Sequence, residues 1–210
     1  MQSYKVFIEN YNIEFVENEK NIKKSSIVIR EKDLTKENFI HLVANNLNNV
    51  NFYVICSDAL SCFTEFINQF TIIEAAGGLV YNPLLNKYLF IKRLGVWDLP
   101  KGKCEIEDNN FLDCALREVS EECGVPFSLL NVTDNLPFET AHYYRCKYTN
   151  KDIIKKTYWY FMETKVGVLK PQLEEDIELC EWFSKSKIND LVLKNTYSTI
   201  KDVLKIGFFM

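Results

Sequence analysis

The sequence predicts an α/β protein in two parts, a small N-terminal α/β domain over residues 1–70 and a larger domain over residues 71–210. Two observations predict this division. Before residue 70, apolar runs of strand length alternate with two segments that have the period of an α-helix. After residue 71, strand-like runs rich in aromatic and β-branched residues dominate, and one strongly helical segment interrupts them.

The first part is predicted to open with a β-hairpin, because two apolar runs follow each other with a tight turn between them. Helices are expected over 35–47, where Thr35 precedes Asn38 in a helix-start pattern, and over 58–70, where Ser57 or Asp58 is placed to cap the first turn. The strands expected here are 4–10, 11–18, 25–31 and 51–57.

In the second part, residues 110–124 predict the strongest helix of the chain. Asn110 is placed to cap it, with Asp113 three residues later, and Gly124 ends it as a C-terminal glycine. A last helical segment is expected over 186–205. The strands expected around these helices are 75–82, 87–93, 96–102, 142–149, 155–165 and 178–184.

Composition indicates an ordinary water-soluble globular protein, with 47% hydrophobic and 26% charged residues. A net charge of −4 disfavours duplex nucleic acid as a partner. No apolar run approaches the length of a membrane span or fits a signal peptide. The seven cysteines include no Cys-x-x-Cys pair, which favours buried free thiols and a cytoplasmic location over disulfides or a zinc site.

Three carboxylates are gathered on one short piece of the strongest helix. Glu118, Glu121 and Glu122 are spaced so that they share a helix face, where like charges repel each other. Oxygen ligands of this kind suit Mg²⁺ or Mn²⁺, and a bound cation would compensate the repulsion. Arg117 is placed to pair with one of the glutamates. The other interpretation of EVSEE is a solvated acidic helix surface.

The surroundings of these carboxylates favour the metal-site interpretation. The segment from Trp97 to Val125 resembles the Nudix box, a glycine, five residues, a glutamate, seven residues, then Arg-Glu-aliphatic-x-Glu-Glu-x-Gly-aliphatic. Gly102 matches the first glycine, and LREVSEECGV matches the second half at every fixed position. The strands AAGGLVYN and LFIKR precede it as they do in that family. The resemblance covers about residues 71–185.

This resemblance implies an α/β/α sandwich with a mixed sheet and a loop–helix–loop metal site. It implies that Glu118 and Glu122 are metal ligands, that Glu121 is a ligand or a group that orients one, and that Arg117 orients the glutamates. A backbone carbonyl near Lys101–Gly102 is implied as a further ligand. The cofactor implied is Mg²⁺ or Mn²⁺.

The first half of the box departs from the family's spacing by one residue. Counting forward from Gly102 places the first acid at Asp108, whereas counting back from Arg117 reaches Asn109. One extra residue therefore lies in this loop, and the first acid of the box is either Glu107 or Asp108. Because the insertion precedes the helix cap, we expect the register of the three helix glutamates to be intact.

A general base and substrate contacts complete the predicted site. Glu175 is the favoured base, with Glu174 and Asp176 as alternatives in the loop before the last strand. Lys101 and Lys103 are predicted to contact phosphate. Tyr143, at an offset that marks the dinucleoside polyphosphate branch of the family, is a candidate base-stacking residue, although a structural strand residue is the other interpretation.

The function expected is metal-dependent hydrolysis of a pyrophosphate bond in a nucleoside diphosphate linked to another moiety, with dinucleoside polyphosphates slightly favoured. The alternative is a Nudix-fold nucleotide-binding or regulatory module without catalysis. The expected partner is a small nucleotide-like substrate, with neither duplex nucleic acid nor a membrane. Three roles are open to residues 1–70, namely a pocket lid, a homodimer surface or a separate binding site.

Overall fold

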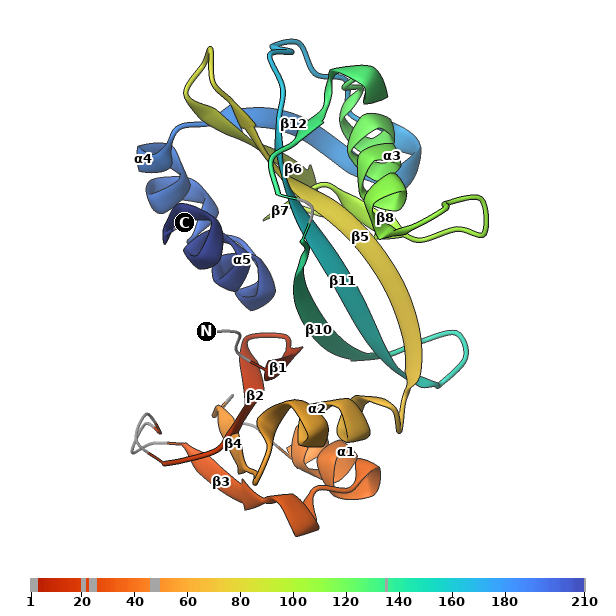
Figure 1. Ribbon diagram of the computed structural model, residues 1–210, viewed down its shortest axis with the longest axis vertical. Coiled ribbons are helices and arrows are strands. Elements are labelled where there is room, and N and C mark those ends of the chain that lie inside the picture. The colour runs from red at the N-terminus through yellow and green to blue at the C-terminus, as the bar shows by residue number, and fades with distance from the viewer. Residues whose placement is uncertain (1–3, 20–21, 23–25, 46–49, 135, 210) are drawn as a thin grey trace. The chain divides into compact units, whose positions relative to one another are not determined.

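The structure is a computed structural model that describes residues 4–19, 22, 26–45, 50–134 and 136–209 (Figure 1). The chain forms two compact units. Unit 1 consists of residues 1–73 and 140–156, and unit 2 consists of residues 74–139 and 157–210. The chain first passes from unit 1 into unit 2 after Ile73, close to the boundary predicted near residue 70. The return of residues 140–156 to unit 1 was not foreseen, and the division into independent domains stays a prediction.

Unit 1 contains a mixed sheet in the strand order β10-β1-β2-β4-β3. The β1–β2 pair is antiparallel, as a hairpin must be, and the pairs β2–β4, β3–β4 and β1–β10 are parallel. The predicted N-terminal hairpin and the two later strands are thereby confirmed. The bounds are Tyr4–Ile8 for β1, Tyr11–Val16 for β2, Ile27–Arg30 for β3, Phe52–Ile55 for β4 and Phe138–Arg145 for β10.

The two helices of unit 1 are α1, Lys36–Asn45, and α2, Ala59–Ile67. The hydroxyl of Thr35 accepts the N–H of Asn38 at 3.2 Å, and the Asp58 carboxylate accepts the N–H of Ser61 at 2.7 Å, so both predicted caps are formed. Aromatic residues of both helices pack against alternate residues of β2 in one core. A single 3₁₀ turn, Glu31–Asp33, follows β3.

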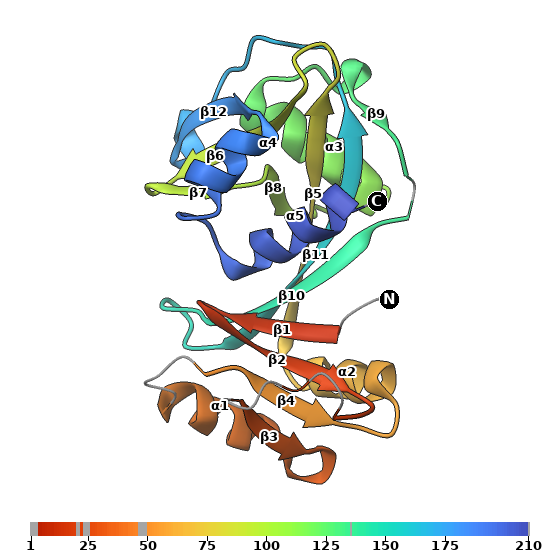
Figure 2. The ribbon, with the colours of Figure 1, turned by 90° about the vertical axis from the view of Figure 1, so that its left-hand side faces the viewer.

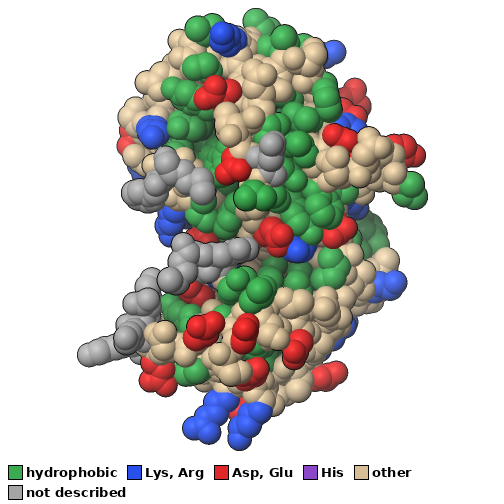
Figure 3. All heavy atoms as spheres, viewed as in Figure 1, with side chains coloured by type: hydrophobic (Ala, Val, Ile, Leu, Met, Phe, Trp, Pro, Cys, Tyr) green, Lys and Arg blue, Asp and Glu red, His purple; other side chains and the backbone are tan. Residues whose placement is uncertain are grey.

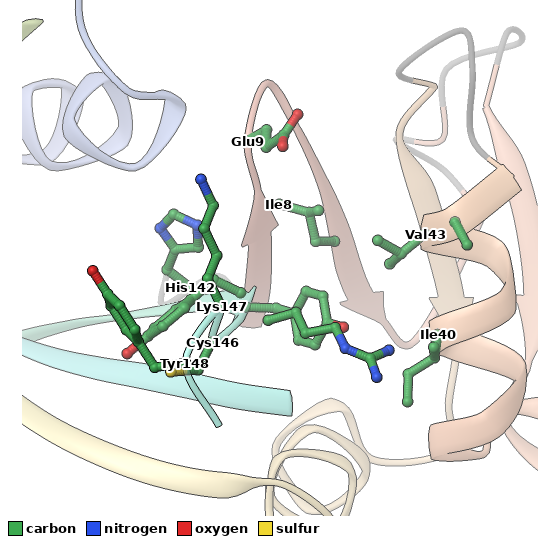
Figure 4. Close-up of a pocket in the computed structure, with 12 residues that line it drawn as sticks. Ile8, Glu9, Ile40, Val43, His142, Cys146, Lys147 and Tyr148 are labelled. Atoms are coloured by element: carbon green, nitrogen blue, oxygen red, sulfur yellow. The ribbon is translucent and has the colours of Figure 1, made fainter. Parts of the chain in front are cut away.

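Unit 1 also holds a pocket of about 670 Å³. Figure 4 shows Ile40 and Val43 of α1 on one side of it, and His142 and Lys147 from the end of β10 and the turn that follows on the other. Ile8 closes it from the end of β1. Its lining is therefore largely apolar, and the charged side chains of Glu9, Arg145 and Lys147 also belong to it.

Unit 2 is built on a sheet in the order β12-β6-β5-β11, with β7 paired to β6, β8 to β5 and β9 to β11. The pairs β5–β6, β6–β12, β6–β7, β5–β8 and β9–β11 are antiparallel. The bounds are Thr71–Asn82 for β5, Lys87–Arg93 for β6, Val96–Asp98 for β7, Lys101–Lys103 for β8, Asn131–Val132 for β9, Asp152–Glu163 for β11 and Ile177–Phe183 for β12.

Helices cover both faces of this sheet, and the burial of alternate residues shows it. Ala76, Leu89 and Tyr158 point into a core formed with α3, Phe111–Cys123. Phe90 and Trp159, the neighbours of Leu89 and Tyr158, and Leu79, an odd number of residues from Ala76, point into a separate core formed with α5, Ser198–Phe209. Because successive strand residues face opposite sides of a sheet, α3 and α5 lie on opposite faces (Figure 1). Unit 2 is therefore the α/β/α sandwich that the sequence predicts.

The helix expected over 186–205 is wrong as a single element. The structure has a short turn of α-helix, α4 at Lys185–Lys187, then a π-helix at Ile188–Val192, and only after a break α5. At the break, the carbonyl of Asn195 accepts the N–H of Trp97 at 3.0 Å, and the Thr196 hydroxyl donates to the carbonyl of Trp97 at 2.7 Å. Pairing with β7 thus replaces the helical hydrogen bonds at this point.

Three general expectations can be compared with the structure. The seven cysteines are all free thiols. Among the described residues, no helix is long and apolar enough to cross a membrane. Acidic and basic side chains are interspersed on the face shown in Figure 3. Figure 2 shows the ribbon from a second direction, at 90° to Figure 1.

Candidate functional site

The candidate site lies where α3 meets β8 in unit 2 (Figure 1). Local sequence fixes both ends of α3. The Asn110 side chain accepts the N–H of Asp113 at 2.9 Å, and Gly124 closes the helix in the left-handed conformation, with φ 68°. Since the two ends are fixed, the three glutamates keep the register that the sequence predicts.

The three helix glutamates do not share one environment. Glu118 and Glu122, one turn apart, are buried, with 8% and 1% of their surface exposed. Glu121 points outward, and 48% of its side chain is exposed. The two inward carboxylates are therefore the groups that the fold removes from water, which costs free energy unless a partner compensates their charge.

The backbone of β8 lies directly against these two carboxylates. The N–H of Lys101 donates to Glu122 Oε2 at 2.7 Å. Next along the strand, a Cβ atom at Gly102 would overlap the carboxylate of Glu118. Glycine is thus required here by close approach, and its conformation is an ordinary extended one.

Arg117 is fully occupied by protein acceptors. Its Nε and Nη2 donate to the two oxygens of Asp108, each at 2.9 Å, and its Nη1 donates to Glu118 Oε1 at 2.8 Å and to Glu121 Oε2 at 3.0 Å. The carbonyl of Lys103 accepts a further bond from Nη2 at 3.0 Å. These bonds fix the rotamers of two glutamates and join the loop to the helix.

The structure distinguishes the two candidates for the first acid of the box. Asp108 forms the bidentate pair with Arg117, and only 6% of its side chain is exposed, whereas Glu107 points into solvent. Hydrogen bonds from Arg117 lower the pKa of Asp108 to about 2. The extra residue therefore lies between Asp108 and the helix, where the Asn109 amide donates to Asp113 at 2.9 Å.

One acid next to the site was not foreseen from the sequence. Asp98, at the end of β7, is buried and pairs with the ammonium of Lys101 at 2.8 Å. Its other oxygen accepts the N–H of Leu99 at 2.8 Å. The sequence shows Asp98 three residues before Lys101. It predicts a single strand over 96–102, however, where the structure has the two strands β7 and β8. In a single strand the two side chains would have pointed to opposite faces.

Burial dominates the titration of the two inward glutamates. It raises the pKa of Glu122 to about 8, with the charges of Glu118 and Asp98 adding to the shift and Lys101 opposing it. Burial also raises the pKa of Glu118, against the opposing effect of Arg117. Glu122 Oε1 is buried and has no hydrogen-bond partner among the described residues. An unsatisfied buried oxygen of this kind calls for a ligand that the protein itself does not supply.

These shifts predict how the stability of the metal-free protein depends on pH. A carboxyl with a raised pKa holds its proton longer in the folded than in the unfolded state, so the free energy of unfolding should fall as pH rises from the ordinary value of 4.5 to about 8. Since one pKa unit corresponds to about 1.4 kcal/mol, the expected loss is on the order of 4 kcal/mol. Urea titrations in the presence of a chelator between pH 5 and 8 would measure it.

The matched control for this prediction is Glu122→Gln, which should reduce the slope, because the group with the pKa of about 8 is gone and only the raised pKa of Glu118 contributes. Asp108 does not interfere, since its lowered pKa affects stability only below its ordinary value of 3.8. An unfolding free energy that rises over this interval, or an equal slope in the variant, would contradict the assignment.

The loop that carries the predicted base is attached to the C-terminal end of α3. The N–H groups of Lys170 and Gln172 donate to the carbonyls of Cys123 and Glu122 at 2.9 and 3.2 Å. Glu175, in the 3₁₀ turn Leu173–Glu175, lies 3.7 Å from Arg93 and is half-exposed. Its charge contributes to the raised pKa of Glu118, so it lies within electrostatic reach of the site.

The other candidates for the base and the substrate contacts lie as follows. Glu174 and Asp176 are exposed, and so is the side chain of Lys103. Tyr143 belongs to unit 1, where its hydroxyl donates to Asp152 at 2.8 Å and its ring lies edge-on to Phe39. Tyr143 is thus not among the residues that unit 2 brings together, and its role as a substrate contact stays a prediction.

Within the described residues, no three His, Cys, Asp or Glu side chains are already grouped to hold a metal ion. Arg117 occupies one oxygen of Glu118 and one of Glu121. The donors that remain are nevertheless of the right kind, because carboxylate oxygens suit hard divalent cations. The buried and unsatisfied Oε1 of Glu122 fits such an ion best.

Comparison with known proteins identifies the family of the chain. The NUDIX domain family matches residues 72–204. Two Saccharomyces cerevisiae proteins, the mRNA-decapping enzyme subunit 2 of strain YJM789 and the m7GpppN-mRNA hydrolase of strain ATCC 204508 / S288c, are each 29% identical over 143 residues. The match covers 66% of this chain, which spans only 13% of the length of either yeast protein.

Solved structures with similar chains include a C. elegans Ap4A hydrolase binary complex, with 17% identity, a TM-score of 0.48 and coverage of 65% of this chain and 96% of that one. Another is the MutT protein of Methanosarcina mazei Go1, with 20% identity, a TM-score of 0.45 and coverage of 64% and 91%. The assignment rests on the family match, which spans more than half of the chain and includes both β8 and α3. The chain therefore belongs to the NUDIX domain family.

Proposed function

We propose that the chain is a pyrophosphohydrolase that depends on a divalent cation, Mg²⁺ or Mn²⁺. The observation that carries the proposal is the pair of buried carboxylates, Glu118 and Glu122, against β8, with Glu122 Oε1 left unsatisfied. Glu118, Glu122 and a backbone carbonyl near Lys101–Gly102 would hold the cation. When bound, it would neutralise phosphate charge and acidify a water molecule.

Other side chains of the site have supporting roles in this proposal. Arg117 holds Glu118 and Glu121 in place through charged hydrogen bonds and does not contact substrate. Glu175 accepts the proton of the attacking water, which its exposed position at the edge of the site permits. The exposed ammonium of Lys103 attracts substrate phosphate.

The substrate class we favour is two nucleosides bridged by a polyphosphate, such as a dinucleoside polyphosphate. The name of the yeast relative, m7GpppN-mRNA hydrolase, describes a substrate with the same kind of bridge. A capped RNA end therefore belongs in the same test. The scissile bond is a phosphoanhydride, and its hydrolysis leaves two phosphorylated products.

Purified protein should hydrolyse at least one substrate of this class when Mg²⁺ or Mn²⁺ is present, and a chelator should abolish the reaction. The panel consists of dinucleoside polyphosphates, a capped oligoribonucleotide, nucleoside diphosphate sugars and nucleoside triphosphates, with products separated by ion-exchange chromatography. Failure to cleave any of them, together with tight binding of an intact nucleotide, would support the alternative of a binding module without catalysis.

A further inference from the structure

Three charged side chains of the site are largely removed from water. They are Asp98 on β7, Lys101 on β8 and Glu122 on α3. The Lys101 ammonium is 2.8 Å from Asp98 Oδ2, and the exposed fractions of the two side chains are 15% and 6%. The backbone of the same lysine donates to Glu122 Oε2. Lys101 therefore contacts both acids. Its side chain pairs with Asp98, and its backbone N–H donates to Glu122.

The second oxygen of Glu122, Oε1, is buried and receives no hydrogen bond from the described residues in this arrangement. The backbone of Lys101 touches this carboxylate, because its N–H donates to Glu122 Oε2 at 2.7 Å, so the lysine side chain starts next to Glu122. Nevertheless, the ammonium forms its ion pair with Asp98. Asp98 in turn is oriented by the N–H of Leu99, which donates to its other oxygen.

An ammonium that is largely removed from water favours a charged partner, because an uncompensated charge in such a place costs several kcal/mol. If the charge of Asp98 were absent, Glu122 Oε1 would be the unsatisfied acceptor on the carboxylate that the backbone of Lys101 already contacts. Pairing there would occupy the same oxygen that a divalent cation requires. The lysine and the cation therefore compete for the Glu122 carboxylate. The position of the Lys101 ammonium determines whether that carboxylate can bind the cation.

We propose that Asp98 is a positioning residue, which keeps the ammonium of Lys101 away from Glu122 and so leaves that carboxylate available to the divalent cation. The inference rests on the proposed function, because it takes Glu122 to be a ligand of the cation. It assigns Lys101 to the positioning of the site, beside the phosphate contact that the sequence suggested for it.

The test measures binding of Mn²⁺ alone, from the electron paramagnetic resonance signal of the free ion, with no substrate present. Asp98→Asn removes the charge and keeps the shape. It should weaken Mn²⁺ binding by about ten- to a hundredfold, the range typical of residues that support a metal ligand. The double variant Asp98→Asn with Lys101→Met has no ammonium to compete, and its affinity should return to within about threefold of the wild type.

A merely structural role of Asp98 predicts a different result, since the double variant would then bind as weakly as the single one. That outcome, or an unchanged affinity in Asp98→Asn, overturns the inference. Circular dichroism melting establishes that each variant folds. Glu178→Gln serves as the matched control, because it removes an acid from a partly exposed pair with Lys92 at 3.8 Å and should leave Mn²⁺ binding unchanged.

Glu122→Gln separates the inference from the proposed function. If the wild type binds Mn²⁺ and Glu122→Gln does not, the cation site stands, and the Asp98 variants decide the inference by themselves. If the wild type and Glu122→Gln bind Mn²⁺ equally, or neither binds, Glu122 is not a ligand, and both the proposed function and the inference fail.

Discussion

Replacing Glu122 by glutamine is expected to lower kcat/KM by on the order of a thousandfold. A bound cation contributes several kcal/mol of transition-state stabilisation, and each ~1.4 kcal/mol corresponds to a factor of ten in rate. The substitution removes the negative charge that holds the cation and keeps the shape of the side chain. Steady-state kinetics on the best substrate of the panel, with Mn²⁺ at a series of concentrations, would measure the effect.

The fold should tolerate this change. Glu122 is buried with a pKa raised to about 8, so in the metal-free protein its ionised form already costs stability. A neutral amide avoids that cost and still offers an oxygen to the N–H of Lys101. We therefore expect a melting temperature at neutral pH, without metal, at or above that of the wild type.

Glu121→Gln is the matched control on the same helix. Its side chain is half-exposed, and its described contact is with Arg117, which keeps three other acceptors. We expect it to reduce kcat/KM by no more than about tenfold, the lower end of the range for a residue that supports a metal ligand. A larger loss at Glu121 than at Glu122 would mean that the outward carboxylate carries the cation and that the site has been assigned to the wrong glutamate.

The second large effect is expected at Gly102. In Gly102→Ala, the new methyl group would overlap the carboxylate of Glu118, so either β8 must move outward or Glu118 must leave its position. Outward movement would break the bond from Lys101 to Glu122, and displacement of Glu118 would break its bond with Arg117. In either case the two inward carboxylates lose their arrangement, and we expect at least about a hundredfold loss of kcat/KM and a lower melting temperature.

Gly167→Ala provides the control for a general effect of adding a methyl group. A Cβ at Gly167 meets no atom within 4 Å, and its backbone is not in the left-handed region. The expected change in stability is within about 0.5 kcal/mol, with activity unchanged. If Gly102→Ala behaved like this control, a methyl group could be accommodated between β8 and Glu118, and the close approach of Gly102 to Glu118 would not be required for activity.

Much of the secondary structure was predictable because local signals fixed it. Helix α3 is the clearest case, since the cap at Asn110, the period of its apolar residues and Gly124 at its end all agree. Local agreement of this kind is what makes a segment adopt one structure. The positions of the glutamates followed from the helix, and their spacing gave the family resemblance.

The helix predicted over 186–205 failed for the opposite reason. Its residues have helical spacing, but Asn195 and Thr196 pair with Trp97, which lies about a hundred residues earlier. A tertiary contact of that kind overrides local propensity and leaves no trace in the local pattern. The return of residues 140–156 to unit 1 has the same origin, since it depends on the parallel pairing of β1 with β10.

The buried carboxylates of the candidate site were predictable, but the residues that support them were not. Glu118, Glu122 and Gly102 are fixed by spacing within one motif. The separation of Glu118 and Glu122 from Glu121 depends on which side of α3 faces the sheet, and the choice between Glu107 and Asp108 depends on the reach of Arg117. Asp98 could be recognised only once β7 and β8 were known to be separate strands, because their relative position decides which acid meets Lys101.

The saturation of Arg117 has a consequence for the order of events in the site. Around α3 and β8 the acids are Asp98, Asp108, Glu118, Glu121 and Glu122. The cations are the exposed Lys103 and, each already paired with an acid, Arg117 and Lys101, so the acids are in excess. A polyphosphate approaching this excess of negative charge would be repelled until a divalent cation was in place. Cation and substrate should therefore bind with positive cooperativity, each raising the affinity for the other by the same factor.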